Sequence, residues 1–72
     1  MPRLKTKIHE YRKQYNLKQD ELAEMVGCRR ETTGKLENGK YNPSLKLAMD
    51  IAKVFHTTVE DVFEFEDDEE TE

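Results

Sequence analysis

Apolar residues recur along the chain at intervals of three and four, which is the spacing of one face of an α-helix. Four of them form such a face near the N-terminus: Leu4, Ile8, Tyr11 and Tyr15. A longer face follows Pro43: Leu45, Ala48, Ile51, Ala52 and Phe55. Between these two faces, shorter helices are predicted over residues 18–26 and 29–37. The pattern therefore favours an all-α protein.

Residues that end or begin helices separate these segments. Gly27 follows the second predicted helix, and glycine accepts the positive φ that often ends a helix. Asn38 and Gly39 end the third helix, and Ser44 is suited to cap the fourth. The stretch from Thr58 to Asp61 resembles a capping box, and it predicts a fifth short helix over Val59, Val62 and Phe63.

The C-terminal end has a different character. Phe63 and Phe65 alternate with acidic residues, a period of two that allows a short strand. The available partner for this strand is the N-terminal segment, residues 1–5, so the chain ends can form a small two-stranded sheet. From Glu66 onward nothing apolar remains to be buried. We therefore expect one domain over residues 1–65 and an acidic, disordered tail over residues 66–72.

Charge is distributed unevenly along the chain. A net charge of −4 over 72 residues at first argues against a nucleic-acid ligand. Residues 1–40, however, carry ten basic and six acidic side chains, a balance of +4. Residues 41–72 carry two basic and ten acidic side chains, a balance of −8. A basic-leaning domain with an acidic tail remains compatible with nucleic-acid binding.

Several other classes of protein are disfavoured. A single cysteine, Cys28, cannot form a disulfide framework, and together with His9 and His56 it lacks metal-ligand spacing. We expect no metal and no cofactor. The chain shows no phosphate-binding loop and no nucleophile with a nearby base, so an enzyme is not expected. No apolar run approaches the roughly 18 residues of a membrane span, and no signal peptide follows Met1. We expect a cytoplasmic protein with no membrane partner and no small-molecule effector.

The second and third predicted helices together describe a helix-turn-helix, two helices of about eight residues joined by a glycine-containing turn. In that motif the second helix enters the DNA major groove with its N-terminal end. Arg30 can bind guanine, and Glu31 can accept a hydrogen bond from cytosine or pair with Lys35 instead. Gly34 costs about 1 kcal/mol inside a helix, and its missing side chain allows a close approach to DNA.

Residues 17–63 resemble the Cro/C1-type, or XRE, helix-turn-helix family. The resemblance lies in these stretches: LKQDELA at 17–23, VG at 26–27, LENGKYNPSL at 36–45 and IAKVF at 51–55. It implies a five-helix lambda-repressor-like domain. It also implies a regulator that binds double-stranded DNA at a palindromic operator as a homodimer. In short relatives the two chain ends often form a small antiparallel sheet.

The resemblance implies roles for individual residues. It assigns contacts with base edges to Arg30, Glu31 and Lys35. Gly34 joins this base-reading set because its missing side chain allows a close approach to DNA. The resemblance places contacts to the DNA backbone at Gln19, Asn38, Lys40 and Tyr41. Three further residues at the starts of the two helices complete the expected set of backbone contacts: Lys18, Arg29 and Thr32. Arg12 and Glu37 occupy positions that in phage-repressor relatives form a largely buried ion pair.

Some positions depart from the family pattern. Arg29 stands where a Ser or Thr cap is usual, and this change removes a capping oxygen while adding a cation near phosphates. Thr33 stands where Ile is usual, and its hydroxyl is expected to bond back to the helix backbone. These changes affect sequence specificity more than the fold.

Repression is the favoured outcome, because a bound dimer would occlude polymerase. One alternative is a protein-interaction adaptor, antitoxin-like or coactivator-like, that uses the acidic tail. Another is an anti-regulator whose tail mimics DNA. For the dimer, the expected surface consists of exposed apolar residues on the fifth helix and the strand after it.

Overall fold

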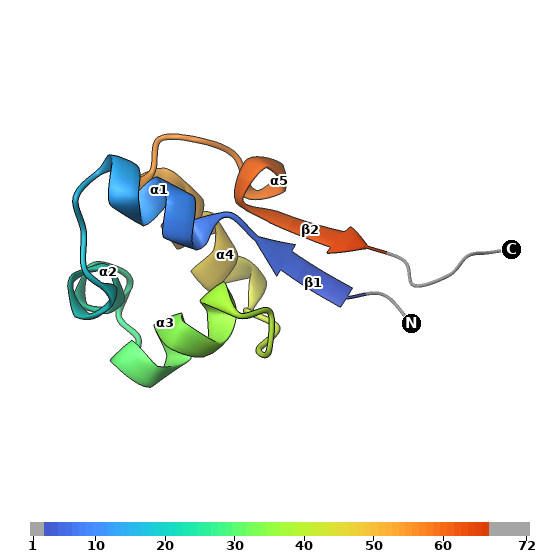
Figure 1. Cartoon of the computed structure of the whole chain (residues 1–72), viewed down its shortest axis with the longest axis horizontal. Helices are drawn as coiled ribbons and strands as arrows, with labels where there is room; N and C mark the ends of the chain where they lie inside the picture. The colour runs from blue at the N-terminus through green and yellow to red at the C-terminus, as the bar shows by residue number, and fades with distance from the viewer. Residues whose placement is uncertain (1–2, 67–72) are drawn as a thin grey trace, which may run out of the picture.

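A computed structural model describes residues 3–66 of the chain (Figure 1). The elements, in chain order, are β1 (Arg3–Thr6), α1 (Ile8–Gln14), α2 (Gln19–Val26), α3 (Arg30–Glu37), α4 (Leu45–Val54), α5 (Val59–Val62) and β2 (Phe63–Glu66). The five expected helices and the sheet formed by the chain ends are confirmed. Residues 67–72 of the predicted tail lie outside the described residues.

The two strands pair antiparallel, so the ends of the domain lie side by side (Figure 1). Leu4 faces Phe65 in the register, and Lys5 faces Glu64. Two of our predictions were wrong here. Leu4 belongs to β1 and not to the first helix, because its backbone pairs with β2. Glu66 belongs to β2 and not to the tail, because it pairs with Arg3 and its carboxylate lies 3.3 Å from Lys5 Nζ.

The helix caps follow the sequence closely. α2 ends at Gly27, which has φ of +76°. Ser44 Oγ accepts a hydrogen bond from the backbone N–H of Leu47 (3.1 Å), and Thr58 Oγ1 accepts one from Asp61 (3.2 Å). The carboxylate of Asp61 accepts a bond from the Thr57 hydroxyl (2.6 Å), and this bond holds the pKa of Asp61 below its ordinary value. α5 ends one residue earlier than predicted, because Phe63 begins β2.

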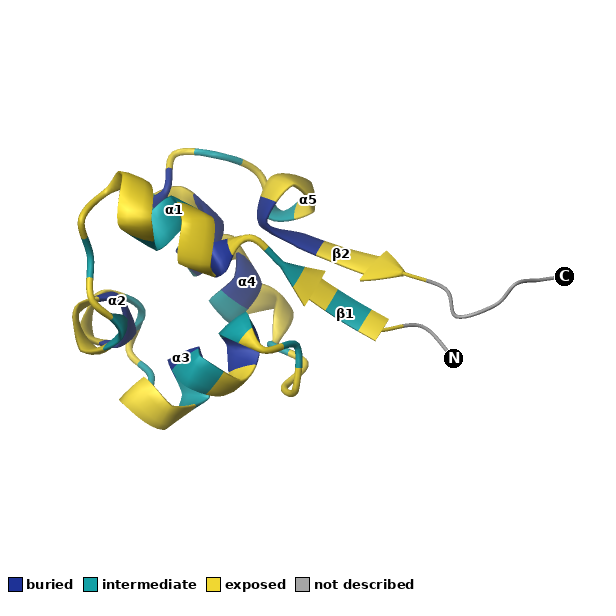
Figure 2. Ribbon diagram, in the orientation of Figure 1, coloured by how far each residue is buried: buried dark blue, intermediate teal, exposed yellow. Residues whose placement is uncertain are grey.

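One apolar core joins all five helices and β2 (Figure 2). Its buried members are Ile8, Leu22, Leu36, Ala48, Ile51, Ala52, Phe55, Val62 and Phe63. The ring of Tyr11 stacks on Phe55 at 5.2 Å, and the Tyr15 hydroxyl donates to the Phe55 carbonyl at 3.0 Å. Leu45, which we expected in the core, is 74% exposed. It is the first residue of α4, and the contacts of this turn with the core come from Leu47 and Ala48.

The turn after α3 lies directly against β1. Gly39 has φ of +70°, and a Cβ added there would overlap the carbonyl oxygen of Leu4. Gly27 has a similar φ, but an added Cβ would meet open space. Substituting Gly27 therefore measures the strain of a left-handed backbone alone. Substituting Gly39 measures that strain together with the overlap against β1.

We expect Gly27→Ala to lower the free energy of unfolding by about 1–2 kcal/mol, because an L-residue is strained at this φ. Gly39→Ala adds overlap with β1, and its loss should be larger by about 1–3 kcal/mol. Urea or thermal unfolding of both variants measures the difference. Equal losses would show that the turn does not pack tightly on β1.

Candidate nucleic-acid interface

The helix-turn-helix consists of α2, the turn over residues 27–29 and α3. The backbone N–H of Cys28 donates to the Ala23 carbonyl (2.9 Å), which closes the turn. Thr33 faces the inside of the motif and is 1% exposed. The partner of its hydroxyl is Cys28 Sγ at 3.6 Å, in place of the backbone bond that we expected. A side-chain contact therefore joins α3 to the turn that precedes it.

The N-terminal end of α3 has no side-chain cap. Arg29 occupies the cap position with an extended backbone, and its side chain supplies no hydrogen bond to the first turn. The exposed N–H groups of a helix start carry a partial positive charge and can bind a phosphate oxygen. Arg29 and Arg30 are both exposed at this end. The end of α3 predicted to meet DNA is thus electropositive.

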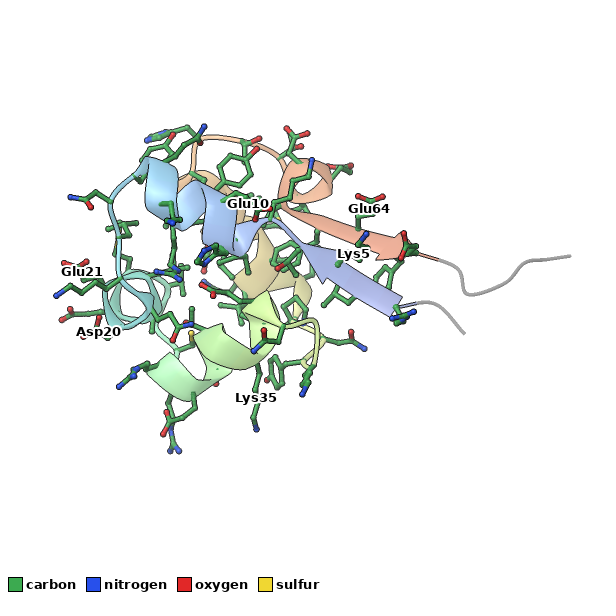
Figure 3. The ribbon with its side chains drawn as sticks, viewed as in Figure 1. Lys5, Glu10, Asp20, Glu21, Lys35 and Glu64 are labelled. Carbon is green, nitrogen blue, oxygen red and sulfur yellow. The ribbon has the colours of Figure 1, made fainter. Side chains whose placement is uncertain are left out.

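The predicted base-reading residues share one side of α3. Arg30, Glu31 and Lys35 are exposed, and Lys35 extends away from the body of the protein (Figure 3). Gly34 is half-buried and lines a shallow hollow with Gln19, Arg30 and Glu31. A Cβ at Gly34 would lie 3.8 Å from Gln19 Oε1, an ordinary contact, so packing does not require glycine here.

Glu31 does not pair with Lys35 within the described part of the chain. The alternative that the sequence left open for Glu31 is therefore not the arrangement in the structure. Its carboxylate stays available on the same exposed face as Arg30.

The predicted backbone-contacting residues fall into two groups beside α3. One group lies at the starts of α2 and α3: Lys18, Gln19, Arg29 and Thr32. The other lies in the turn after α3, where Asn38, Lys40 and Tyr41 line a second hollow together with Leu4 and Phe65. Sequence reasoning missed the presence of β1 beside this turn, because no local pattern signals a contact between residues so far apart.

Glu37, the last residue of α3, joins three helices through its carboxylate. Arg12 of α1 donates to it from Nε and from Nη2, the second bond at 3.3 Å. Gln19 Nε2 of α2 donates to Oε1 at 3.1 Å. The side chains of Arg12 and Glu37 are only 12% and 9% exposed. Because the pair is largely shielded from water, its attraction is stronger than that of a surface ion pair.

The charge of the described region differs from that of the whole chain. Residues 3–66 hold twelve basic and eleven acidic side chains, so the whole negative balance comes from residues outside this region. Asp20 and Glu21 extend from α2 in a different direction from Lys35 (Figure 3). These two acidic side chains therefore do not cover the side of α3 that carries Lys35.

Other kinds of site find no support in the described region. Residues 3–66 contain no cluster of three or more His, Cys, Asp or Glu side chains that could hold a metal ion. None of the helices described has the length and apolar character needed to cross a membrane.

Comparison with known proteins agrees with this geometry. The helix-turn-helix family model matches residues 8–62, and the chain belongs to this family, in its Cro/C1-type, or XRE, branch. It is therefore a DNA-binding transcription regulator and not an enzyme. An HTH-type transcriptional regulator of Archaeoglobus fulgidus is 54% identical over 92% of this chain and 93% of its own length. One from Methanocaldococcus jannaschii is 50% identical over 92% of this chain and its whole length.

Solved structures show the same fold. The transcriptional regulator VanUg superposes with a TM-score of 0.73 at 25% identity, covering 89% of this chain and 85% of its own. A Bacteroides fragilis protein superposes with a TM-score of 0.74 at 18% identity, covering 85% of this chain and 98% of its own. The second likeness bears on the fold alone.

We expect Arg12→Ala to lower the free energy of unfolding by about 3–5 kcal/mol, because it leaves the shielded Glu37 carboxylate without its cation. Arg30→Ala is the matched control, since it removes an exposed arginine from α3. It should change stability by no more than about 0.5 kcal/mol. Thermal melting of both variants tests this, and an unchanged melting temperature for Arg12→Ala would contradict the structural role of the ion pair.

Proposed function

We propose that this protein binds a palindromic DNA operator as a homodimer, with α3 of each protomer in the major groove, and that it represses transcription. The observation that carries the proposal is the exposed face of α3. Its start is uncapped and flanked by Arg29 and Arg30. Its end is held to α1 and α2 through Glu37. A helix fixed in this way can present a defined set of side chains to base edges.

The side chains on the exposed face of α3 are suited to different bases. Arg30 and Lys35 are suited to the O6 and N7 acceptors of guanine, and the unpaired Glu31 to the amino group of cytosine. Gly34 lies between them and presents no side chain. The helix can therefore come close to the floor of the groove at that point.

Phosphate contacts would flank these residues on both sides. Lys18, Gln19, Arg29 and Thr32 lie at the starts of the two helices. Asn38, Lys40 and Tyr41 lie in the turn after α3. Such contacts set the register of the helix in the groove, while the base contacts set the sequence.

Exposed apolar residues favour a dimer surface that keeps the strand part of the expected surface but not the helix part. In α5, Val62 is buried and Val59 packs against the core, so this helix offers little apolar surface. Among the large exposed apolar side chains, Leu45 and Met49 lie on α4 and Phe65 lies on β2. A symmetric interface over these residues would remove them from water, and it would need to place the two α3 helices about 34–36 Å apart.

Binding at a promoter would block access of polymerase, which is why repression is the proposed outcome. We also propose a cytoplasmic location, because a transcription regulator acts on DNA inside the cell. We propose that occupancy of the operator follows protein concentration and the dimer equilibrium.

Selection of bound duplexes from a random pool, followed by mobility shift, tests the proposal. We expect an enriched palindrome bound by two protomers. Arg30→Ala should weaken that complex by about tenfold or more, because a bidentate contact to guanine is worth about 1–3 kcal/mol. Lys53→Ala, which removes an exposed cation from α4, is the matched control and should have little effect.

Two other results would contradict part or all of this proposed function. No enriched sequence, and no retardation of any duplex at low salt, would favour the adaptor function. An enriched sequence without two-fold symmetry would leave DNA binding in place and overturn the homodimer.

A further inference from the structure

The carbonyl groups of the last turn of α3 are all hydrogen-bonded, and one of their partners comes from far away in the sequence. The last four carbonyls of a helix have no partner inside the helix. Here the turn after α3 satisfies three of them: Asn38 N–H donates to Gly34, Lys40 N–H to Lys35 and Gly39 N–H to Leu36, at 2.9–3.2 Å. The fourth, the carbonyl of Glu37, accepts a bond from Thr6 Oγ1 of β1 at 3.2 Å.

Thr6 is itself held by the other end of the domain. It faces Phe63 in the β1–β2 register, and the N–H of the next residue, Lys7, donates to the Val62 carbonyl at 2.8 Å. Thr6 is half-buried, so its hydroxyl is less free to exchange this bond for one to water. A strand formed by the chain ends therefore fixes the C-terminal end of α3.

A second contact acts at the same place. Gly39 lies so close to β1 that a Cβ would overlap the Leu4 carbonyl oxygen. The turn after α3 is thus held against β1 by a hydrogen bond on one side and by backbone packing on the other. This turn carries Asn38 and Lys40, two of the residues that the proposed function assigns to the DNA backbone.

We infer that Thr6 is a positioning residue for DNA binding: through the Glu37 carbonyl it sets where the end of α3 and the following turn lie relative to the rest of the domain. It touches no DNA. The inference rests on the proposed function, because it concerns the residues that the proposal places on DNA. The β1–β2 sheet would then do more than pair the two ends of the chain, since it would also position residues that contact DNA.

Thr6→Val tests the inference, since valine keeps the shape of threonine and removes the donor. We expect operator affinity to fall about three- to tenfold, the effect of one lost hydrogen bond. Affinity for a duplex of unrelated sequence should fall less, because it depends mainly on charge. Thr6→Ser keeps the hydroxyl and should restore operator affinity to within about twofold.

Thr57→Val is the matched control. It removes a hydroxyl that donates to Asp61 at the start of α5, a bond that does not involve α3. It should lower stability without changing operator affinity. Titration at protein and DNA concentrations well above Kd counts the binding-competent fraction, so that partial unfolding of any variant is separated from weaker binding.

Amide hydrogen exchange of Asn38, Gly39 and Lys40 gives a readout that needs no DNA. Exchange of these amides should be faster in Thr6→Val than in wild type, and unchanged in Thr6→Ser and Thr57→Val. If exchange follows this pattern but wild-type protein binds no duplex, the proposed function is wrong and the bracing of α3 stands. If wild type binds its operator and Thr6→Val binds equally well, or if Thr6→Ser is as weak as Thr6→Val, the inference is overturned.

Discussion

The carboxylate of Glu37 is the point on which the arrangement of the helices depends. Arg12 from α1 and Gln19 from α2 both donate hydrogen bonds to it, and Glu37 itself is the last residue of α3. A domain this small buries few apolar side chains, so the core alone fixes the relative positions of its short helices only weakly. A charge pair that is mostly shielded from water, with each bond in a defined direction, fixes them more sharply.

The same residue connects stability to function. Its carboxylate holds Gln19 at the start of α2, and its carbonyl accepts from Thr6, which borders the turn with Asn38 and Lys40. Both groups of proposed phosphate contacts are therefore positioned relative to one residue at the end of α3. The basic side chains of α3 can act as a DNA-binding face although the whole chain is acidic, because the described region is close to neutral.

Local features were predictable from the sequence, whereas contacts between distant segments were not. Glycine at 27 and serine at 44 ended and capped helices as expected, because their effects depend on neighbouring residues. Leu4 fitted a helical spacing, but pairing with Phe65 placed it in a strand. Leu45 fitted the core face of α4, yet the first turn of that helix leaves it exposed. The bond from Thr6 to Glu37 spans 31 residues, and no periodicity signals it.

We propose that α3, held in place by Glu37, is the surface that meets DNA. Backbone amide chemical shifts recorded while the selected duplex is added test it residue by residue. We predict that the chemical shifts change most over residues 29–41 and at Lys18 and Gln19. They should change little on the outer face of α4 near Lys53. Changes centred on α4, or none at saturating duplex, would contradict this proposal.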